Sequence, residues 1–523
     1  MLRRLILLPL LSAFFLTLAF PIFNIAFLAW FALVPLLIAV KGERLGQAFL
    51  TGYITGLLFF SATIYWVSYV VIIGAVALVL YLALYFGAFA VGVDLLLVRF
   101  PKPGIRYAVL VSGLWVGLEY LRSHLFTGFG WALLGYSQWE NLPLIQIADM
   151  TGVYGVSFLI VFTNALISSK IKKKVKGFRP DPRYLSLLVM MLIVVAMYGF
   201  FRMDQKFKGP TLKISVIQAN IPQHRKWDEK YAGDILESHI RLTKEVAKDK
   251  PNLIVWPETS VPGYLEKDQI LFKKISNLAK VLNTYLLVGT PTEIDEEWPA
   301  YFNSAVLISN EGKVLKRYDK LRLVPFGEYV PFGNGIFSFV RTRYDVGEDY
   351  TPGEEHTLFE VPIEKDLKAK FGVLICFEDI FPELVREFVK NGADFMVNIT
   401  NDAWFMKTGA PYQHAQASVF RAIENRMNFI RSANTGYSCF IDQKGKVVEG
   451  VKDTQGEKIF VPGYATANIV PIKGATFYSK YGDLFAWVCI GAFLFDLTFY
   501  FIYNYINLRR KSGRGKRDNK TED

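Results

Sequence analysis

The chain has 523 residues, 52% of them hydrophobic, and its formal net charge is +12 at pH 7. This composition is too apolar for an ordinary soluble protein, and it leaves room for a membrane bundle and a complete catalytic domain. The excess of lysine and arginine lies largely in short loops beside apolar segments, which indicates membrane topology and argues against a nucleic-acid partner. Three cysteines without clustered histidines predict neither a disulfide framework nor a metal site.

Apolar segments towards both ends of the chain predict a polytopic α-helical membrane bundle. A helix needs roughly 20 apolar residues to cross the hydrocarbon core of a bilayer, and about eight segments approach that length. The expected membrane helices span residues 5–20, 22–40, 48–70, 72–98, 107–125, 153–168, 185–201 and 484–506.

Basic loops orient this bundle. Lysine and arginine precede the first expected helix, recur in every second loop and follow the last helix. Because basic loops stay in the cytoplasm, we expect both termini there and the long polar region outside. The expected domains are a membrane bundle (1–202), an extracytoplasmic catalytic domain (203–482), an eighth transmembrane helix (483–508) and a basic cytoplasmic tail (509–523).

The loop before the sixth expected helix is rich in aromatic residues and glycine. It contains the run Thr127-Gly-Phe-Gly-Trp131 and, further on, Tyr136 and Trp139. Such residues at the outer interface form either a lipid-facing vestibule or an ordinary aromatic belt, and the sequence favours neither.

The region after Arg202 has the pattern of an α/β domain in which helices cover sheets. Strand-like runs occur at residues 212–218, 253–256, 285–289, 304–309, 371–376, 395–399 and 438–441. Helical patterns occur at residues 233–248, 268–282, 381–390 and 412–431.

Two charged residues in this domain lie where catalytic groups are often found. Glu258 follows an apolar strand, so its carboxylate is a candidate general base, although a turn or helix-cap role would also explain it. Lys320 lies among apolar and aromatic neighbours, where a cation can stabilise a developing oxyanion. The alternative is an ordinary solvated surface lysine.

Cys376 is the candidate nucleophile. An apolar strand runs directly into it and a helix is expected a few residues later, a step that resembles a nucleophile elbow. The helix dipole and a nearby lysine would lower the pKa of the thiol and favour the thiolate. The alternative is a small, buried core residue.

Taken together, Glu258, Lys320 and Cys376 resemble, in this order, the catalytic triad of the nitrilase superfamily. The resemblance covers residues 212–470. It implies an α-β-β-α sandwich in which the glutamate is the general base, the lysine stabilises the oxyanion and the cysteine is acylated.

The position of this domain between the seventh and eighth membrane helices resembles the apolipoprotein N-acyltransferase family, over almost the whole chain. Segments 218–223, 324–332 and 398–405 support the resemblance. It implies that Glu328, Glu378 and Trp227 are also needed for activity. Phe377 stands where the family commonly has tyrosine, which keeps an aromatic wall but removes a hydroxyl. Gly130 stands where the vestibule loop usually has proline.

This resemblance implies transfer of a fatty acyl chain from a phospholipid to the α-amino group of a diacylglyceryl-cysteine at the N-terminus of an apolipoprotein. The reaction would be ping-pong through a Cys376 thioester, without a cofactor, in a monomer of the bacterial cytoplasmic (inner) membrane. The main alternative is a membrane-tethered amidase of the same superfamily that hydrolyses small amides.

A transporter with a degenerate outer domain is a further alternative, because Asp94, Glu119 and Asp496 lie in expected membrane helices. The joint presence of all the candidate catalytic residues argues against a degenerate outer domain.

Overall fold

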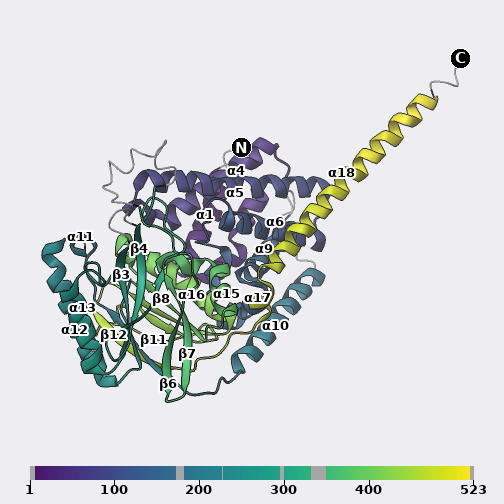
Figure 1. Cartoon of the computed structure of the whole chain (residues 1–523). Coiled ribbons are helices and arrows are strands. Elements are labelled where there is room, and N and C mark those ends of the chain that lie inside the picture. Colours follow the sequence, from purple (N-terminus) through teal and green to yellow (C-terminus); the bar gives the residue numbers. More distant parts are fainter. Residues whose placement is uncertain (1–5, 172–181, 227, 295–299, 331–348, 519–523) are drawn as a thin grey trace.

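The computed structural model describes residues 6–171, 182–226, 228–294, 300–330 and 349–518, with side chains described as far as Ile506. Trp227 lies outside the described residues. The N-terminal part is helical (Figure 1). Its main helices are α1 (Leu8–Leu18), α2 (Ala29–Ala32), α3 (Val34–Ala39), α4 (Leu45–Thr63), α5 (Ile72–Arg99), α6 (Ile105–His124), α7 (Leu142–Ile145), α8 (Ala148–Thr151), α9 (Val153–Lys170) and α10 (Pro182–Asp204).

Among the described residues, five helices are long and apolar enough to cross a membrane: α4, α5, α9, α10 and α18 (Leu484–Asp518). The other three expected spans differ from the prediction. Helix α1 has only 11 residues. The second span is broken into α2 and α3 beside Pro35, whose ring cannot donate a helical hydrogen bond. Helix α6 has 20 residues, and its charged side chains lower its mean hydropathy.

The acidic residues of the bundle have partners. Glu119 accepts a hydrogen bond from the Leu134 N–H across 2.7 Å. Asp496 lies 2.5 Å from both Arg99 and Arg106. Asp94 accepts from the Gly42 N–H at 3.3 Å. These contacts give the three carboxylates structural roles, so they do not support a transport pathway.

Two six-stranded sheets form the second part of the molecule. One has the order β12-β1-β2-β3-β4-β5 and the other β11-β10-β9-β8-β7-β6. In each, three central strands are parallel and antiparallel strands flank them. The strands are β1 (Leu212–Gln218), β2 (Leu253–Val255), β3 (Tyr285–Ile294), β4 (Ala300–Ile308), β5 (Val314–Asp319), β6 (Leu358–Glu364), β7 (Leu367–Ile375), β8 (Phe395–Thr400), β9 (Asn428–Ala433), β10 (Cys439–Ile441), β11 (Val447–Gly450) and β12 (Gly463–Ile469).

The sheets pack face to face with helices on their outer sides. Helices α12 (Ala232–Val246) and α13 (Gln269–Leu282) cover the first sheet, far from the bundle (Figure 1). Helices α15 (Pro382–Lys390) and α16 (Ala410–Asn425) cover the second sheet and lie toward the bundle. The Ser432 hydroxyl donates to backbone oxygens of β1 and β2, which joins the two sheets. The expected α-β-β-α sandwich is therefore confirmed.

One predicted helix was too long. The pattern at residues 412–431 predicted a single helix, but α16 ends at Asn425 and Arg426 has φ +53°. The chain then reverses into β9, whose polar side chains have buried partners inside the sandwich. Strands β5, β6, β9, β11 and β12 were not predicted.

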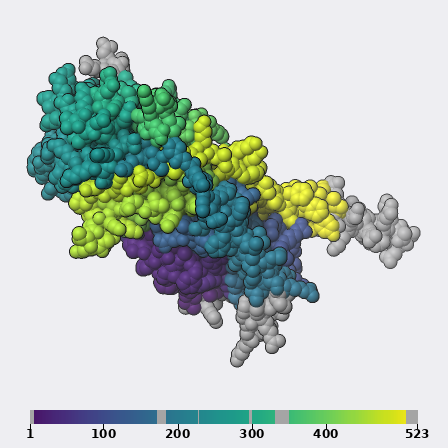
Figure 2. Space-filling model, turned by 90° about the horizontal axis from the view of Figure 1, so that it is seen from below, coloured from purple at the N-terminus to yellow at the C-terminus, as the bar shows by residue number. Residues whose placement is uncertain are grey.

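Helix α16 also carries much of the contact between the sandwich and the bundle, which pack directly on each other (Figure 2). Gln413 donates to the Thr63 carbonyl oxygen across 2.9 Å and accepts from the Trp66 indole N–H at 3.1 Å. Just beyond the helix, Arg426 pairs with Asp149 of α8 at 2.8 Å. Helix α16 and the residue that follows it thereby help to attach the second sheet to the membrane helices.

Candidate active site

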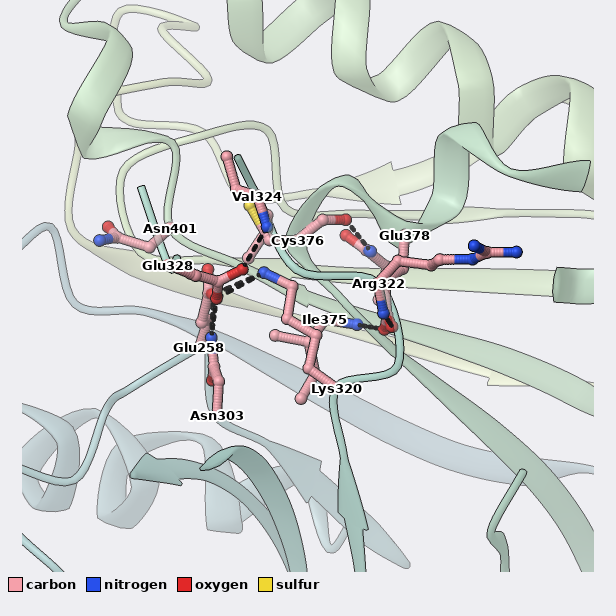
Figure 3. A network of polar contacts seen from close by, with 12 residues as sticks. Glu258, Asn303, Lys320, Arg322, Val324, Glu328, Ile375, Cys376, Glu378 and Asn401 are labelled. Carbon is pink, nitrogen blue, oxygen red and sulfur yellow. Dashed lines mark hydrogen bonds and ion pairs between the residues drawn. The ribbon is translucent and has the colours of Figure 1, made fainter. Parts of the chain in front are cut away.

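The three candidate catalytic residues lie at or just past strand ends of the two sheets. Glu258 follows β2, Lys320 directly follows β5, and Cys376 directly follows β7. Their side chains converge in one place, together with that of Glu328 (Figure 3). Glu258 is 7% exposed, Lys320 1% and Cys376 8%. The fold therefore brings together residues that are far apart in the sequence, and it shields them from bulk water.

Asn303 of β4 links the two carboxylates of the site. Its Nδ2 atom donates to Glu258 Oε1 and to Glu328 Oε1, each across 2.8 Å. Lys320 Nζ lies 2.8 Å from Glu328 Oε1 and 3.7 Å from Glu258 Oε1. Glu328 also accepts from the Val324 N–H at 2.8 Å, which fixes the loop after the lysine. The Lys320 ammonium group thus lies between the carboxylates of Glu258 and Glu328, and the Asn303 side chain fixes the positions of both carboxylates.

Lys320 is charged in this environment. Burial opposes its charge, but the carboxylates of Glu328 and Glu258 outweigh burial and raise the pKa of the lysine. A second lysine, Lys226, donates to the backbone oxygen of Glu258 across 2.8 Å. Burial lowers the pKa of Lys226 to about 8. The site therefore holds a fixed cation beside its carboxylates and another basic group nearby.

Cys376 occupies a strained backbone position at the elbow. Its φ is +57°, a conformation that costs a non-glycine residue about 1–2 kcal/mol. The expectation of a lowered thiol pKa is not met: burial and then the Glu258 carboxylate raise the pKa of Cys376, against the opposing effect of Lys320. A short 3₁₀ turn (Cys376–Ile380) follows the strand directly, and helix α15 begins only at Pro382, so Cys376 does not lie in the first turn of an α-helix, where a helix dipole acts. The thiol of this candidate nucleophile is therefore neutral at rest, and a nucleophilic role would require a base.

Glu378 ties the elbow to the loop that follows Lys320. It is fully buried, and its carboxylate accepts from the Ile375 N–H at 2.7 Å, on the strand that precedes the cysteine. It also accepts from the Leu321 N–H at 2.7 Å and the Arg322 N–H at 2.9 Å. Burial raises the pKa of Glu378 to about 7, against the lowering effect of these donors. The Glu378 carboxylate therefore holds the end of β7 and the loop after Lys320 in place, and its hydrogen bonds give it a positioning role.

Two further predicted residues have different outcomes. The Phe377 ring lies 5.4 Å from Lys320 Nζ and packs edge-on against Phe381, so an aromatic wall is present beside the cation. Trp227 cannot be placed, because it lies outside the described residues.

Three aromatic rings of the bundle loop lie inside the protein. Trp131, Tyr136 and Trp139 are all buried. Arg122 of α6 holds the loop by donating to the backbone oxygens of Phe129 and Trp131 at 2.9 and 2.7 Å. The loop packs inward, against the sandwich.

Sequence reasoning missed several polar residues at the site. Asn303, Asn398 and His414 lie within expected or observed regular elements, where a polar side chain gives no local signal of its partner. Asn398 begins the segment 398–405, which entered the sequence analysis only as support for a resemblance. Within the part of the chain that the structure describes, no group of three or more His, Cys, Asp or Glu residues is placed to hold a metal ion.

Comparison with known proteins places this arrangement in a family. A family model described as the apolipoprotein N-acyltransferase N-terminal domain matches residues 12–166, and one described as carbon-nitrogen hydrolase matches residues 213–469. An apolipoprotein N-acyltransferase of Geobacter metallireducens is 39% identical over 507 residues, which is 93% of this chain and 94% of the relative. The chain belongs to the apolipoprotein N-acyltransferase family.

Another apolipoprotein N-acyltransferase, from Chlorobaculum tepidum, is 30% identical over 92% of this chain and 94% of its own length. A solved structure of a Saccharomyces cerevisiae member of branch 10 of the nitrilase superfamily covers 51% of this chain and 93% of that chain, with 19% identity and a TM-score of 0.37. Membership in the apolipoprotein N-acyltransferase family confirms the expectation of a membrane enzyme of the acyltransferase class with a carbon-nitrogen hydrolase domain.

Proposed function

We propose that this enzyme moves a fatty acyl chain from a membrane phospholipid to the α-amino group of an N-terminal diacylglyceryl-cysteine, with Cys376 as the nucleophile. The convergence of Glu258, Lys320 and Cys376 in one buried site carries the proposal (Figure 3). Family membership over nearly the whole chain supports the choice of substrates.

In the first half-reaction, Glu258 takes the proton of the Cys376 thiol as the sulfur attacks the ester carbonyl carbon of the phospholipid. The raised pKa of the thiol supports a need for this base. Lys320 stabilises the negative charge that forms on the carbonyl oxygen. The intermediate then expels the lysophospholipid alkoxide, which takes the proton from Glu258, and a thioester remains on the sulfur.

In the second half-reaction, the neutral α-amine of the diacylglyceryl-cysteine attacks the thioester carbonyl. Glu258 accepts a proton from the attacking nitrogen, and Lys320 again faces the oxyanion. The carbon–sulfur bond breaks, the cysteine sulfur recovers a proton from Glu258, and an amide leaves as the N-acylated lipoprotein. The two substrates react in turn, so the kinetics are ping-pong.

Glu328 and Asn303 act as supports in this scheme. Both contact Glu258 or Lys320 directly, and they keep the base and the cation 3.7 Å apart. Losing one oxyanion donor typically costs about 3 kcal/mol of barrier, so the position of the lysine head matters as much as its charge. We place Glu378 in a positioning role for the same reason.

The lipid substrates explain the membrane helices. Each CH₂ group moved from the bilayer into water costs about 0.8 kcal/mol, so the site must lie close to the acyl chains it handles. We propose that the enzyme lies in the cytoplasmic (inner) membrane of a bacterium. Based on the alternation of basic loops, both termini are in the cytoplasm. The proposed parts are a membrane bundle (1–202), an extracytoplasmic domain (203–482), a last transmembrane helix (483–508) and a cytoplasmic tail (509–523). All the groups of the site belong to one chain, which supports a monomer.

The test compares acyl transfer with hydrolysis. Full-length enzyme in vesicles receives a phospholipid labelled in its acyl chain and a diacylglyceryl-cysteine peptide with a free amine. We expect labelled amide and lysophospholipid in equal amounts, and no transfer to the same peptide with an acetylated amine. Release of labelled fatty acid without amide, or of ammonia from small amides, would instead support the membrane-tethered amidase.

A further inference from the structure

A buried cluster of four charged residues lies beneath the nucleophile elbow. Asp379, Asp402, His414 and Arg431 are all 0% exposed. His414 Nε2 lies 2.9 Å from Asp379 Oδ1, and its Nδ1 lies 3.0 Å from Asp402 Oδ1. Arg431 Nη1 lies 2.5 Å from Asp379 Oδ2. None of these residues belongs to the proposed triad, yet they lie next to it.

The composition of this cluster requires a charged histidine. Two carboxylates face a single guanidinium, so a neutral imidazole would leave one buried negative charge uncompensated. Such a charge is costly in a protein interior, whereas an imidazolium balances the cluster. A protonated His414 also has two N–H donors, one on each ring nitrogen. Nδ1–H points at Asp402, and Nε2–H is available to Asp379 and to the elbow.

The elbow contact is the carbonyl oxygen of Cys376. It accepts from His414 Nε2 at 3.2 Å and from Asn398 Nδ2 at 2.8 Å. Because Cys376 has φ +57°, its peptide needs such external contacts to keep a strained orientation. A peptide unit is planar and trans, so anchoring the oxygen on one side directs the Phe377 N–H to the opposite side. In a nucleophile elbow the N–H of the residue after the nucleophile is an oxyanion donor.

We propose that His414 is a positioning residue that, together with Asn398, fixes the Cys376 carbonyl oxygen so that the Phe377 N–H faces the oxyanion during acyl transfer. This inference rests on the proposed thioester chemistry at Cys376. His414 touches neither the substrate nor the sulfur; it acts through the peptide plane. The charge of the imidazolium strengthens its hydrogen bond to the carbonyl, as charge-assisted bonds are roughly twice as strong as neutral ones.

The same histidine connects the elbow to the membrane bundle. Its ring lies 5.2 Å from the ring of Trp131, in the loop held by Arg122. Trp131 in turn packs edge-on against Trp66, whose indole N–H donates to Gln413, the neighbour of His414 on α16. An imidazolium against an aromatic ring is stabilised by the π electrons. The full chain, with its bundle, is therefore the form in which to test this histidine.

The test separates acylation from thiol reactivity. Single-turnover thioester formation passes through an oxyanion, whereas alkylation of the same sulfur by iodoacetamide does not. Both rates are measured on full-length enzyme in vesicles, with Cys376 followed by peptide mass spectrometry. For His414→Ala we expect acylation to fall about 100-fold while alkylation stays within about threefold of wild type. His414→Gln keeps an N–H donor without the charge, and should lose only about tenfold.

Two further variants complete the design. Asn398→Ala removes the second donor to the same oxygen and should show the same selective loss of acylation. This variant tests the proposal even if His414→Ala does not fold. His239→Ala is the matched control: His239 is also buried, on α12, and bonds the Ile235 carbonyl oxygen of its own helix rather than the Cys376 carbonyl oxygen. Its acylation and alkylation rates should both match those of wild type.

Several results would overturn the inference. Unchanged acylation in His414→Ala, or in Asn398→Ala, would show that the carbonyl contacts do not position the oxyanion donor. A parallel loss of acylation and alkylation would show a general structural role. If the wild-type enzyme formed no thioester at all, the proposed function itself would be wrong. The wild-type measurement tests this before any variant is compared.

Discussion

Lys320 Nζ lies 2.8 Å from Glu328 Oε1, and this ion pair sits almost wholly inside the protein. Glu328 shares its carboxylate between the lysine, Asn303 and the Val324 N–H. It therefore sets the position of the cation relative to Glu258. Without it, the lysine would be drawn onto the proposed general base, which is only 3.7 Å away.

This relationship predicts the effect of Glu328→Gln. The substitution should lower the rate of thioester formation about 100-fold, because the cation moves toward the base and away from the oxyanion. Breaking a buried ion pair should also cost about 3 kcal/mol of stability. Glu360→Gln is the control, since it removes an exposed pair with Lys368 and should cost less than about 1 kcal/mol. Equal thermal stability and equal rates for the two variants would contradict the assignment.

Glu378→Gln should loosen the elbow. One carboxylate oxygen becomes an NH₂ group that faces backbone donors, so at least one of the Ile375, Leu321 and Arg322 N–H groups loses its acceptor. A buried unsatisfied donor costs about 1–3 kcal/mol, and we expect this loss in thermal unfolding together with slower acylation. Tyr318→Phe removes only one hydroxyl donor to the same carboxylate and should cost less. A Glu378→Gln enzyme that unfolds and acylates like wild type would exclude the positioning role.

The protonation state of Cys376 predicts a pH profile. Burial and Glu258 raise the pKa of the thiol, so its thiolate fraction should grow about tenfold per pH unit between pH 6 and pH 9. Alkylation of Cys376 by iodoacetamide should rise in the same way without a plateau. An exposed cysteine in a short peptide, whose thiol pKa is about 8.5, begins to level off at the upper end of this range and serves as the reference. A plateau for Cys376 near neutral pH would indicate a preformed thiolate.

His414 predicts a pH-dependent contribution to stability. Burial opposes its charge, but Asp379 and Asp402 raise the pKa of His414 from 6.5 to about 9, with Arg431 acting against them. A raised folded-state pKa stabilises the fold fully below pH 6.5, and this contribution is lost as the pH rises through 9. The stability difference between wild type and His414→Gln should thus shrink by about 3 kcal/mol over that window. A difference that stays constant from pH 6 to pH 9.5 would show that the histidine is neutral.

The sequence predicted those parts of the fold that depend on local pattern. The run at residues 212–218 coincides with β1, because its apolar residues are bounded by a clear change in composition. Strand β9 was hidden because Arg431 and Ser432 look solvent-exposed in a sequence, yet in the sandwich Arg431 pairs with Asp379 and Ser432 bonds a strand of the other sheet. Charge compensation of this kind depends on residues distant in the chain.

In the candidate site, too, residues with a local sequence signal could be predicted, and residues whose role depends on distant partners could not. Glu258 and Cys376 could be found because each stands beside a strand signal, and Lys320 because it lies among apolar and aromatic neighbours. Their supports could not: Asn303 gains its role only from two glutamates that β4 meets in the folded state. The thiol pKa was predicted in the wrong direction, because burial by neighbouring elements outweighs the effect of a lysine, and no sequence pattern reports burial at that position.

Intact-protein mass spectrometry after incubation with phospholipid tests the central claim most directly. The full-length enzyme should gain the mass of one acyl chain, located at Cys376 and removed by hydroxylamine. Cys376→Ala should gain nothing, Cys376→Ser at most a slow adduct, and Cys439→Ala and Cys489→Ala should be acylated like wild type, because both of those thiols are buried elsewhere. An acyl adduct that persists in Cys376→Ala, or that maps to any other residue, would contradict the account.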